Sequence, residues 1–282
     1  MAKVSLVYRM ATPAAVSLAR SLSAYLKEKG HDVLTAPEQK LITGTKKAST
    51  SDMAKSQLVI ALGGDGTYLR AVRLLNGNKT PILGVNLGSL GFLTPTRTEE
   101  VFTSVEFALS GKMKSQPRSM IEVEILKKGK SRGKFLALND VVMERGSLSQ
   151  IINISVTSGK NLVSEVKADG IIVATPTGST AYNLSAGGPI LDPESKVFVV
   201  TPIAPHGLNS RPIIFPDNRS LNLKLVGKLH RAHLVTDGMV IGELTNDDEI
   251  IVRRSKSDHY MVCDPSIQFF SLLREKLRFG DR

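Results

Sequence analysis

The sequence contains little cysteine and few aromatic residues. One cysteine, Cys263, occurs in 282 residues, tryptophan is absent, and aromatic residues make up 5% of the chain. A single cysteine excludes an internal disulfide framework and a zinc site built from several thiolates, and it is typical of a reducing compartment. The scarcity of aromatic rings disfavours the stacking platforms on which single-stranded nucleic acids bind. These absences predict a cytoplasmic protein that does not bind nucleic acid.

Long apolar runs are also missing. The longest uncharged stretch, residues 170–191, is interrupted by Gly, Pro, Ser and Thr and is too polar to cross a bilayer. The first apolar stretch contains Arg9 and follows Lys3, so it lacks the continuous apolar core of a signal peptide. We therefore expect no membrane partner and a cytoplasmic location.

Positive charge is in excess, with a formal net charge of +11. Such a charge suits a nucleic-acid-binding protein and equally an enzyme that holds polyanionic nucleotides. The net charge therefore does not distinguish these two classes of protein. The densest basic segment, residues 127–134, lies between two strand-like runs and is typical of a solvated hairpin tip. With 41% hydrophobic residues, a chain of 282 residues is long enough for two domains with cores of their own.

A glycine-rich loop follows the apolar run of residues 58–62 and leads into helical spacing over residues 68–75. This order predicts a buried strand, a loop and a helix. Glycines let the backbone approach a ligand closely, and the unpaired N–H groups at a helix start attract an anion. The predicted phosphate loop consists of Gly63, Gly64, Gly66 and Thr67.

An acidic residue, Asp65, occupies the middle of this loop. Neither the Walker pattern nor the dinucleotide fingerprint is present, and a carboxylate beside phosphates is electrostatically unfavourable. Asp65 could hold a Mg²⁺ ion that bridges phosphates, or it could accept a proton from a hydroxyl that is being phosphorylated. An isolated Asp-Gly pair usually marks only a tight turn, but the flanking glycines and the strand-to-helix setting favour a functional role.

The secondary-structure pattern divides the chain into two domains. Strands and helices alternate over residues 1–104, which predicts an α/β nucleotide-binding domain with a parallel sheet and ligands at the carboxyl ends of its strands. Residues 105–265 contain many short β-type runs with Gly, Pro and Asn between them, which predicts a mostly β, sandwich-like domain. Residues 266–282 return to helical spacing, and we expect this C-terminal helix to pack back on the first domain.

Two segments of the second domain carry polar groups in apolar surroundings. Asn139 and Asp140 interrupt the strand-like run of residues 135–143, where polar side chains are costly to bury unless they bind a ligand or pair with a neighbouring backbone. Residues 175–182, Thr-Pro-Thr-Gly-Ser-Thr-Ala-Tyr, place hydroxyls, backbone N–H groups and a ring side by side, as a nucleotide site requires. An ordinary Thr/Ser/Pro loop is the alternative.

These motifs together resemble the NAD kinase family. The resemblance rests on residues 63–67, Asn139-Asp140, Asp169-Gly170, residues 175–182 with residues 185–189, and Pro205-His206 with Arg211-Pro212. The first motif resembles diacylglycerol, sphingosine and phosphofructo kinases as well, whereas the Thr-Pro-Thr-Gly-Ser-Thr-Ala-Tyr segment is far more specific to NAD kinases.

The resemblance implies transfer of the terminal phosphoryl group of ATP, or of polyphosphate in some members, to the 2′-hydroxyl of the adenosine ribose of NAD, giving NADP. It also implies Mg²⁺ or another divalent cation, although the sequence does not identify the metal ligands. The expected partners are NAD and ATP as substrates and further copies of the same chain in a homodimer or homotetramer. Residues 105–265 would then be the NAD-binding domain.

The family's functional residues can be carried over onto matching positions. Asp65 matches the catalytic acidic residue close to the acceptor hydroxyl, Asn139 and Asp140 match the pair that holds the ribose and adenine, and Asp169 matches the acid near the nicotinamide end. The NAD-binding residues implied in this way are Asp65, Gly66, Arg70, Asn139, Asp140, Lys167, Asp169, Thr180, Ala181, Tyr182 and Ser185. One departure is Met239, which follows Asp237-Gly238 where many members have Gln.

Two other functions compete with this interpretation. A catalytically silent NAD-binding sensor would keep the binding loop without needing Asp65, so the presence of that residue favours an enzyme. A lipid or sugar kinase would share the first glycine motif, but the tyrosine-containing segment of residues 175–182 argues against it.

Overall fold

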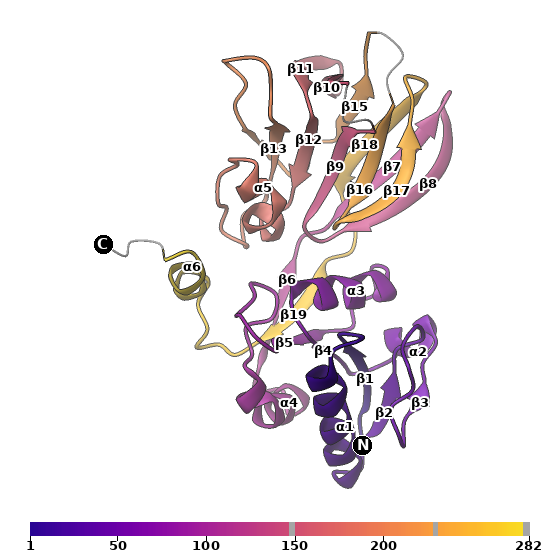
Figure 1. Ribbon diagram of the computed structural model, residues 1–282, viewed down its shortest axis with the longest axis vertical. Helices are drawn as coiled ribbons and strands as arrows, with labels where there is room; N and C mark the ends of the chain where they lie inside the picture. The colour runs from indigo at the N-terminus through magenta and orange to yellow at the C-terminus, as the bar shows by residue number, and fades with distance from the viewer. Residues whose placement is uncertain (147–149, 228–230, 279–282) are drawn as a thin grey trace. The chain divides into compact units, whose positions relative to one another are not determined.

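The structure is a computed structural model that describes residues 1–146, 150–227 and 231–278 (Figure 1). The chain forms two compact units. Unit 1 comprises Met1–Pro117 together with Asp258–Arg282, and unit 2 comprises Arg118–Ser257. Within the described ranges, no helix combines the length and the apolar composition needed to span a membrane.

Unit 1 is built on a seven-stranded sheet with the strand order β3-β2-β1-β4-β5-β19-β6. The neighbouring pairs from β3 through to β19 are all parallel, as predicted for an α/β domain. The strands are β1 (Lys3–Tyr8), β2 (Asp32–Thr35), β3 (Lys46–Lys47), β4 (Leu58–Leu62), β5 (Ile82–Val85), β6 (Lys114–Arg118) and β19 (His259–Cys263).

Helices cover both faces of this sheet (Figure 1). Helices α1 and α4 pack on one face, where Leu22 and Val105 join Leu6 and Ile60 in a single apolar cluster. Helix α3 lies on the other face and buries Tyr68, among other residues. The helical segments are α1 (Pro13–Glu28), α2 (Thr50–Ala54), α3 (Asp65–Leu75), the 3₁₀ turn η1 (Thr98–Glu100), α4 (Val101–Leu109) and α6 (Phe269–Leu277). Because all five residues of β4 are buried, the uninterrupted apolar run is the pattern expected of a central parallel strand.

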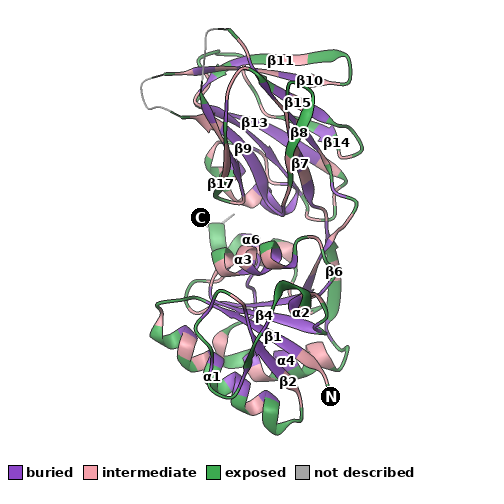
Figure 2. Cartoon of the chain, turned by 90° about the vertical axis from the view of Figure 1, so that its right-hand side faces the viewer, coloured by how far each residue is buried: buried purple, intermediate pink, exposed green. Residues whose placement is uncertain are grey.

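Unit 2 contains two six-stranded sheets, with the orders β11-β10-β15-β18-β7-β8 and β14-β13-β12-β9-β16-β17. Residues of both sheets form one apolar core, so the sheets pack face to face as a sandwich (Figure 2). The elements are β7 (Ile121–Lys127), β8 (Lys130–Ala137), β9 (Asp140–Arg145), β10 (Ile152–Ser158), β11 (Asn161–Ala168), β12 (Gly170–Ala174), η2 (Thr177–Thr180), α5 (Tyr182–Ser185), β13 (Val197–Ile203), β14 (Ile213–Pro216), β15 (Leu221–Leu225), β16 (Ala232–Thr236), β17 (Met239–Leu244) and β18 (Asp248–Arg254). The basic segment at 127–134 is the β7–β8 hairpin, as predicted.

The structure differs from the predicted pattern at residues 135–143. This run is not one strand, because β8 ends at Ala137 in one sheet and β9 begins at Asp140 in the other. The backbone N–H groups between them are bound by the carboxylate of Asp237 rather than by a neighbouring strand. The chain therefore passes from one sheet to the other at Leu138-Asn139, which the apolar pattern alone does not show.

The boundaries of the two units lie at 117/118 and 257/258, whereas the sequence pattern suggested 104/105 and 265/266. Helix α4 belongs to unit 1 because Val101 and Val105 join its core. Strand β19 also belongs to unit 1 because Met261 and Val262 pair with β5.

Helix α6 returns to unit 1, as expected of the C-terminal segment. The rings of Phe269 and Phe92 lie 6.2 Å apart, Lys276 Nζ lies 4.7 Å from the ring centroid of Phe92, and Arg97 forms a 2.8 Å ion pair with Glu275. Of the apolar residues at helical spacing in this segment, Leu273 is buried, whereas Phe270 and Leu277 are exposed. Residues 279–282 of the predicted returning segment lie outside the described residues.

Candidate active site

Asp65 is the first residue of α3, at the carboxyl end of β4, with Gly64 as the N-cap. Its Oδ2 accepts a 3.1 Å hydrogen bond from the N–H of Phe92, and its Oδ1 accepts from the N–H of Leu93 at 3.1 Å and from Thr94 Oγ1 at 3.0 Å. A carboxylate has about four acceptor positions. In the part of the chain that the structure describes, the remaining position is therefore on Oδ2.

The glycines around Asp65 serve different purposes. A Cβ on Gly63 would lie 2.2 Å from Thr67 Oγ1, and a Cβ on Gly91 would lie 2.0 Å from Asp65 Oδ1, so both positions require glycine for close approach. A Cβ on Gly64 or Gly66 would meet no atom within 4 Å. The surface of the loop is open at these two residues.

The backbone N–H groups of the predicted phosphate loop are not equally available. The N–H of Gly63 donates to Val85 O at 2.8 Å, and that of Thr67 donates to Gly64 O at 2.9 Å. Within the described ranges, the N–H groups of Gly64 and Gly66 donate to no backbone carbonyl. These two residues are the loop's candidates for binding an anion.

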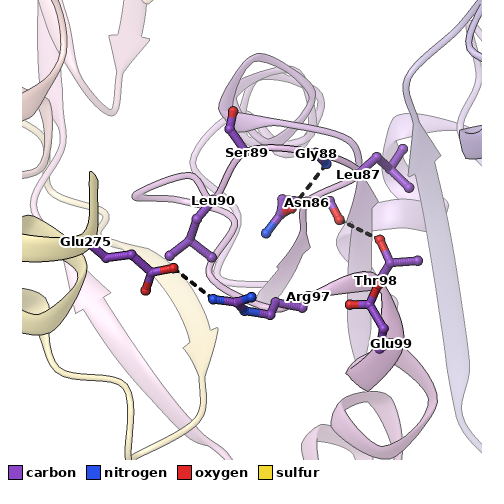
Figure 3. Close-up of a pocket in the computed structure, with 9 residues that line it drawn as sticks. All are labelled: Asn86, Leu87, Gly88, Ser89, Leu90, Arg97, Thr98, Glu99 and Glu275. Carbon is purple, nitrogen blue, oxygen red and sulfur yellow. Dashed lines mark hydrogen bonds and ion pairs between the residues drawn. The ribbon is translucent and has the colours of Figure 1, made fainter. Parts of the chain in front are cut away.

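A second glycine-rich loop supports Asp65 from the neighbouring strand β5. A cavity of about 420 Å³ lies beside it, and its lining includes the ion pair of Arg97 and Glu275 (Figure 3). Asn86 braces the loop, since its Oδ1 accepts from the N–H of Gly88 at 3.2 Å and its carbonyl accepts from Thr98 Oγ1 at 2.8 Å. The residues that bind Asp65 therefore belong to an internally hydrogen-bonded segment.

Arg70, which the family resemblance implies as an NAD-binding residue, is paired in this structure. Its Nη2 lies 2.8 Å from Glu38 Oε2, and its Nε lies 3.2 Å from the same oxygen. Glu38 is well exposed, so this pair is screened by water and weak. A phosphate group could therefore compete with Glu38 for the guanidinium.

In unit 2, Asn139 and Asp140 are both buried, at 8% and 4% exposure. The carboxylate of Asp237 accepts from the N–H groups of Leu138 at 2.8 Å, Asn139 at 2.8 Å and Asp140 at 3.2 Å. Asp237 lies in the turn between β16 and β17 and was singled out in the sequence only as the neighbour of Met239. Its contact with residues 97 to 99 positions away has no local sequence signal.

The environment of Asp140 disfavours its ionised form. Burial, and then the negative charge of Asp237, raise the pKa of Asp140 to about 7. The carboxyl group of Asp140 therefore changes from its neutral to its ionised form near neutral pH. Such perturbed groups cluster at functional sites.

The Thr-Pro-Thr-Gly-Ser-Thr-Ala-Tyr segment packs directly against Asn139. The N–H of Thr175 donates to Asn139 O at 2.9 Å, and the backbone of Gly178 lies so close that a Cβ there would be 2.0 Å from Asn139 O. Among the described residues, two buried atoms of this region have no hydrogen-bond partner, Asn139 Oδ1 and Thr177 Oγ1. Because an unpaired buried polar atom is unfavourable, both are candidates for contact with a ligand.

Two further residues shape this segment and were missed in the sequence. Asn183 is fully buried, donates from Nδ2 to Ser179 O and Pro189 O at 3.0 Å each, and accepts from Thr201 Oγ1 at 2.7 Å. Ser179 Oγ accepts from the N–H of Leu191 at 3.0 Å. In the sequence, Ser179 lies within the motif of residues 175–182 and Asn183 directly follows it, and neither position reveals that the side chain is buried.

The predicted residues of the segment's second half are accessible. Tyr182 is 42% exposed, Ser185 is exposed, and Thr180 and Ala181 are half-buried. The pKa of Tyr182 is raised by burial and then by the negative charges of Glu144, Asp140 and Asp169.

Asp140 and Asp169 lie at opposite ends of a strand pair. Strands β9 and β12 are antiparallel, with Asp140 opposite Ala174 and Glu144 opposite Gly170, the residue after Asp169. Asp169 therefore lies opposite Arg145, and five residue steps of about 3.3 Å each separate it from Asp140 by about 16 Å along the strands. The negative charges of Asp140 and Asp169 both raise the pKa of Tyr182. Asp140, Asp169 and Tyr182 therefore outline an elongated site.

The other predicted residues at the Asp169 end are charged. Asp169 forms an ion pair with Arg145, with Oδ1 and Nη1 3.1 Å apart. Lys167 is exposed on β11, and its carbonyl accepts from the N–H of His206 at 2.9 Å. Unit 2 thus brings together Asn139, Asp140, Asp169 and Tyr182, while Asp65, Gly66 and Arg70 belong to unit 1.

Comparison with known families identifies the chain. Residues 4–113 match the ATP-NAD kinase N-terminal domain, and residues 138–263 match the ATP-NAD kinase C-terminal domain. The chain belongs to the NAD kinase family. The resemblance predicted from the motifs is thereby confirmed.

Individual relatives agree over the whole length. The NAD kinase of Bdellovibrio bacteriovorus is 59% identical over 280 residues, which cover 99% of this chain and 92% of the relative. The NAD kinase of Syntrophotalea carbinolica is 38% identical over 287 residues and covers 100% of both chains.

Two solved structures, one of an NADH kinase and one of an NAD kinase, share the fold of this chain. Yeast NADH kinase complexed with NADH superposes with a TM-score of 0.92 at 27% identity, covering 100% of this chain and 89% of the yeast chain. An NAD kinase from Archaeoglobus fulgidus in complex with ATP gives a TM-score of 0.76 at 24% identity, covering 97% and 99%, and supports the fold alone. The predicted order of an α/β domain, a β-rich domain and a returning helix is confirmed.

Proposed function

We propose that this chain transfers the terminal phosphoryl group of ATP to the 2′-hydroxyl of the adenosine ribose of NAD, giving NADP and ADP. The observation that carries the proposal is the match of residues 4–113 and 138–263 to the two NAD kinase domains. The 59% identity to an NAD kinase over nearly the whole chain supports it. The enzyme is a phosphotransferase with an alcohol group as acceptor.

Asp65 is the proposed catalytic residue. The ribose 2′-oxygen forms a bond to the γ-phosphorus of ATP while the bond from that phosphorus to the β–γ bridging oxygen breaks, and ADP leaves. The hydroxyl proton passes to Asp65, whose Oδ2 keeps one acceptor position. A positioned general base of this kind contributes about 10²- to 10⁴-fold to the rate.

The proposed phosphate contacts begin with the N–H groups of Gly64 and Gly66 at the start of α3. Backbone N–H groups at a helix N-terminus stabilise the negative charge of a transferring phosphoryl group. Gly63 and Thr67 contribute by shaping the loop, since their own N–H groups are bound to the backbone. Arg70 joins the phosphate or ribose contacts when it leaves Glu38.

The proposed reaction also uses Mg²⁺ or another divalent cation. Among the described residues there is no cluster of three or more His, Cys, Asp or Glu side chains suited to a metal. Mg²⁺ does not require such a cluster, because it would be held by the substrate phosphates and water together with one or two carboxylates. Gly64 and Gly66 would act on the ion only through the phosphates that their N–H groups bind, because an N–H group is a donor and does not ligate a cation. When bound, the cation neutralises charge on the phosphates.

The proposed dinucleotide contacts follow the elongated site of unit 2. Asn139 and Asp140 hold the adenosine end, and Asn139 Oδ1 is one of the unpaired buried atoms that a ribose hydroxyl or an adenine amine would satisfy. Asp169 lies at the other end, where the nicotinamide half would be placed, with Lys167 as a phosphate or ribose contact. Tyr182 packs against a base. Thr180, Ala181 and Ser185 line the site between the adenosine end and the nicotinamide end.

Assembly and location extend the same proposal. The enzyme works in the cytoplasm as a homodimer or homotetramer, in line with the family resemblance. Its one cysteine, Cys263, is buried and free, as is usual for a protein of a reducing compartment.

The proposal is tested by incubating the purified protein with NAD, ATP and Mg²⁺ and measuring NADP with an NADP-specific dehydrogenase. NADP formation is expected. Parallel reactions with polyphosphate as donor and with NADH as acceptor define the substrate range, the latter because a structural neighbour is an NADH kinase. Saturable NAD binding without NADP from any donor would contradict the proposal and indicate the sensor function.

A further inference from the structure

The Asp237 carboxylate binds the segment that carries Asn139 and Asp140. It accepts three successive backbone N–H groups, those of residues 138–140, at 2.8, 2.8 and 3.2 Å. We infer that Asp237 is a positioning residue for the adenosine half of the dinucleotide, because it fixes the backbone from which Asn139 and Asp140 project. This inference rests on the proposed function of the same site.

The need for such a residue follows from the path of the chain. Between β8 in one sheet and β9 in the other, the N–H groups of residues 138 and 139 have no strand to pair with. The carbonyl oxygens of the same two residues are bound by the side chain and the N–H of Thr175. The segment is therefore held on both sides, by Asp237 at its donors and by Thr175 at its acceptors.

Asp237 does more than form a turn. It has a φ of +46° and precedes Gly238 with a φ of +76°, the conformation of a two-residue hairpin turn in which Asp-Gly is common. Asn or Gly would serve such a turn as well. An amide oxygen offers about two acceptor positions, whereas a carboxylate offers about four, so only Asp suits both the turn and the three N–H groups.

Loss of this contact should loosen the adenosine site specifically. Asn139 Oδ1, the atom left unpaired in the interior, depends on the backbone position that Asp237 fixes. Met239 is exposed on β17, and the three contacts of Asp237 are made without it. The effect should therefore appear in the affinity for the adenosine half and not in the affinity for ATP.

The experiment compares Asp237→Ala and Asp237→Asn with the wild type. Calorimetric titration with ADP-ribose, which contains the adenosine half of NAD, should show a dissociation constant about tenfold or more higher for Asp237→Ala and a smaller increase for Asp237→Asn. The KM for NAD should rise in parallel while the KM for ATP stays unchanged. This split would not result from a purely structural loss of stability.

A matched control is Asp248→Asn. Asp248 is the buried first residue of β18 in the same unit, and it accepts from the N–H of Thr245 at 2.8 Å, away from residues 138–140. It should lose stability and keep the affinity for ADP-ribose. Asp237 variants that bind ADP-ribose within about twofold of the wild type would overturn the inference, and Asp237→Asn carries the test if Asp237→Ala does not fold. A wild type that binds neither ADP-ribose nor NAD would instead overturn the proposed function.

Discussion

The hydroxyl of Thr94 donates a 3.0 Å hydrogen bond to Oδ1 of Asp65. With the N–H groups of Phe92 and Leu93, it joins the loop after β5 to the loop after β4. Adjacent parallel strands bring their carboxyl-end loops to the same edge of a sheet, which is where ligands bind in such folds. The orientation of the proposed base therefore depends on a segment 27 to 29 positions along the chain.

Thr94→Val should lower kcat about tenfold with little change in the KM for NAD. Valine keeps the shape of the side chain but removes the hydroxyl, so the carboxylate gains freedom to rotate away from the productive orientation. Steady-state NADP formation measures the effect. Thr94→Ser keeps the hydroxyl and should retain most of the turnover, whereas equal losses in both variants would show that the hydrogen bond is not responsible.

Asp140→Asn should stabilise the protein increasingly as the pH rises. The folded-state pKa of Asp140 is raised from 3.8 to about 7, so the stability linked to its proton is fully present below pH 3.8 and is lost as the pH rises through 7. Asparagine carries no charge at any pH. Relative to the wild type, the variant should gain about 2 kcal/mol at pH 5 and on the order of 4 kcal/mol at pH 8.

Urea unfolding at the two pH values tests the direction of this effect. The gain in the free energy of unfolding must be larger at pH 8 than at pH 5. A gain that is equal at both would mean that the Asp140 carboxyl ionises in the folded protein as easily as in the unfolded chain. The affinity of the same variant for NAD should also differ from that of the wild type, since Asp140 is a proposed contact of the adenosine end.

Asn183→Ala should destabilise the protein by about 2 to 4 kcal/mol, because it leaves the carbonyls of Ser179 and Pro189 and the hydroxyl of Thr201 without their partner in the interior. The change in the midpoint of urea unfolding measures this loss. A loss below about 0.5 kcal/mol, the range of ordinary surface substitutions, would contradict the role given to Asn183.

Gly178→Ala should abolish NAD binding. The added Cβ would lie 2.0 Å from Asn139 O, and a backbone atom cannot move aside as a flexible side chain can. The control is Gly242→Ala in the same unit, where the nearest atom, Ile125 Cδ1, is 3.5 Å away and in ordinary contact. Equilibrium binding of NAD to both variants distinguishes a local clash at the site from a general effect of alanine.

Much of the fold could be predicted because its signals are local. The five apolar residues of β4 and the glycines after them determine a strand, a loop and a helix within eighteen positions, from Leu58 to Leu75. The same holds for the alternating pattern of β7, in which every second residue is buried. Edge strands such as β11 and β17 carry a weaker signal, because neither shows a regular alternation of buried and exposed residues along its length.

The details of the candidate site depend on distant residues and could not be predicted. Only Asn139 and Asp140 interrupt the strand-like run of residues 135–143, and the backbone that changes sheet there is bound by Asp237, 98 positions from Asn139. The three donors to Asp65 likewise come from another loop. Sequence motifs predicted which side chains would bind substrate, and these assignments remain predictions, whereas the residues that hold those side chains in place required the tertiary structure.

The central claim is that Asp65 accepts the proton of the acceptor hydroxyl. Asp65→Asn keeps the size of the side chain and an acceptor for the Leu93 and Thr94 donors, but it removes the basicity. NADP formation and NAD affinity should be measured on the same preparations of wild type and variant. We predict that the variant binds NAD within a few-fold of the wild type and forms NADP at least 10²-fold more slowly. NADP formation at the wild-type rate would contradict the account.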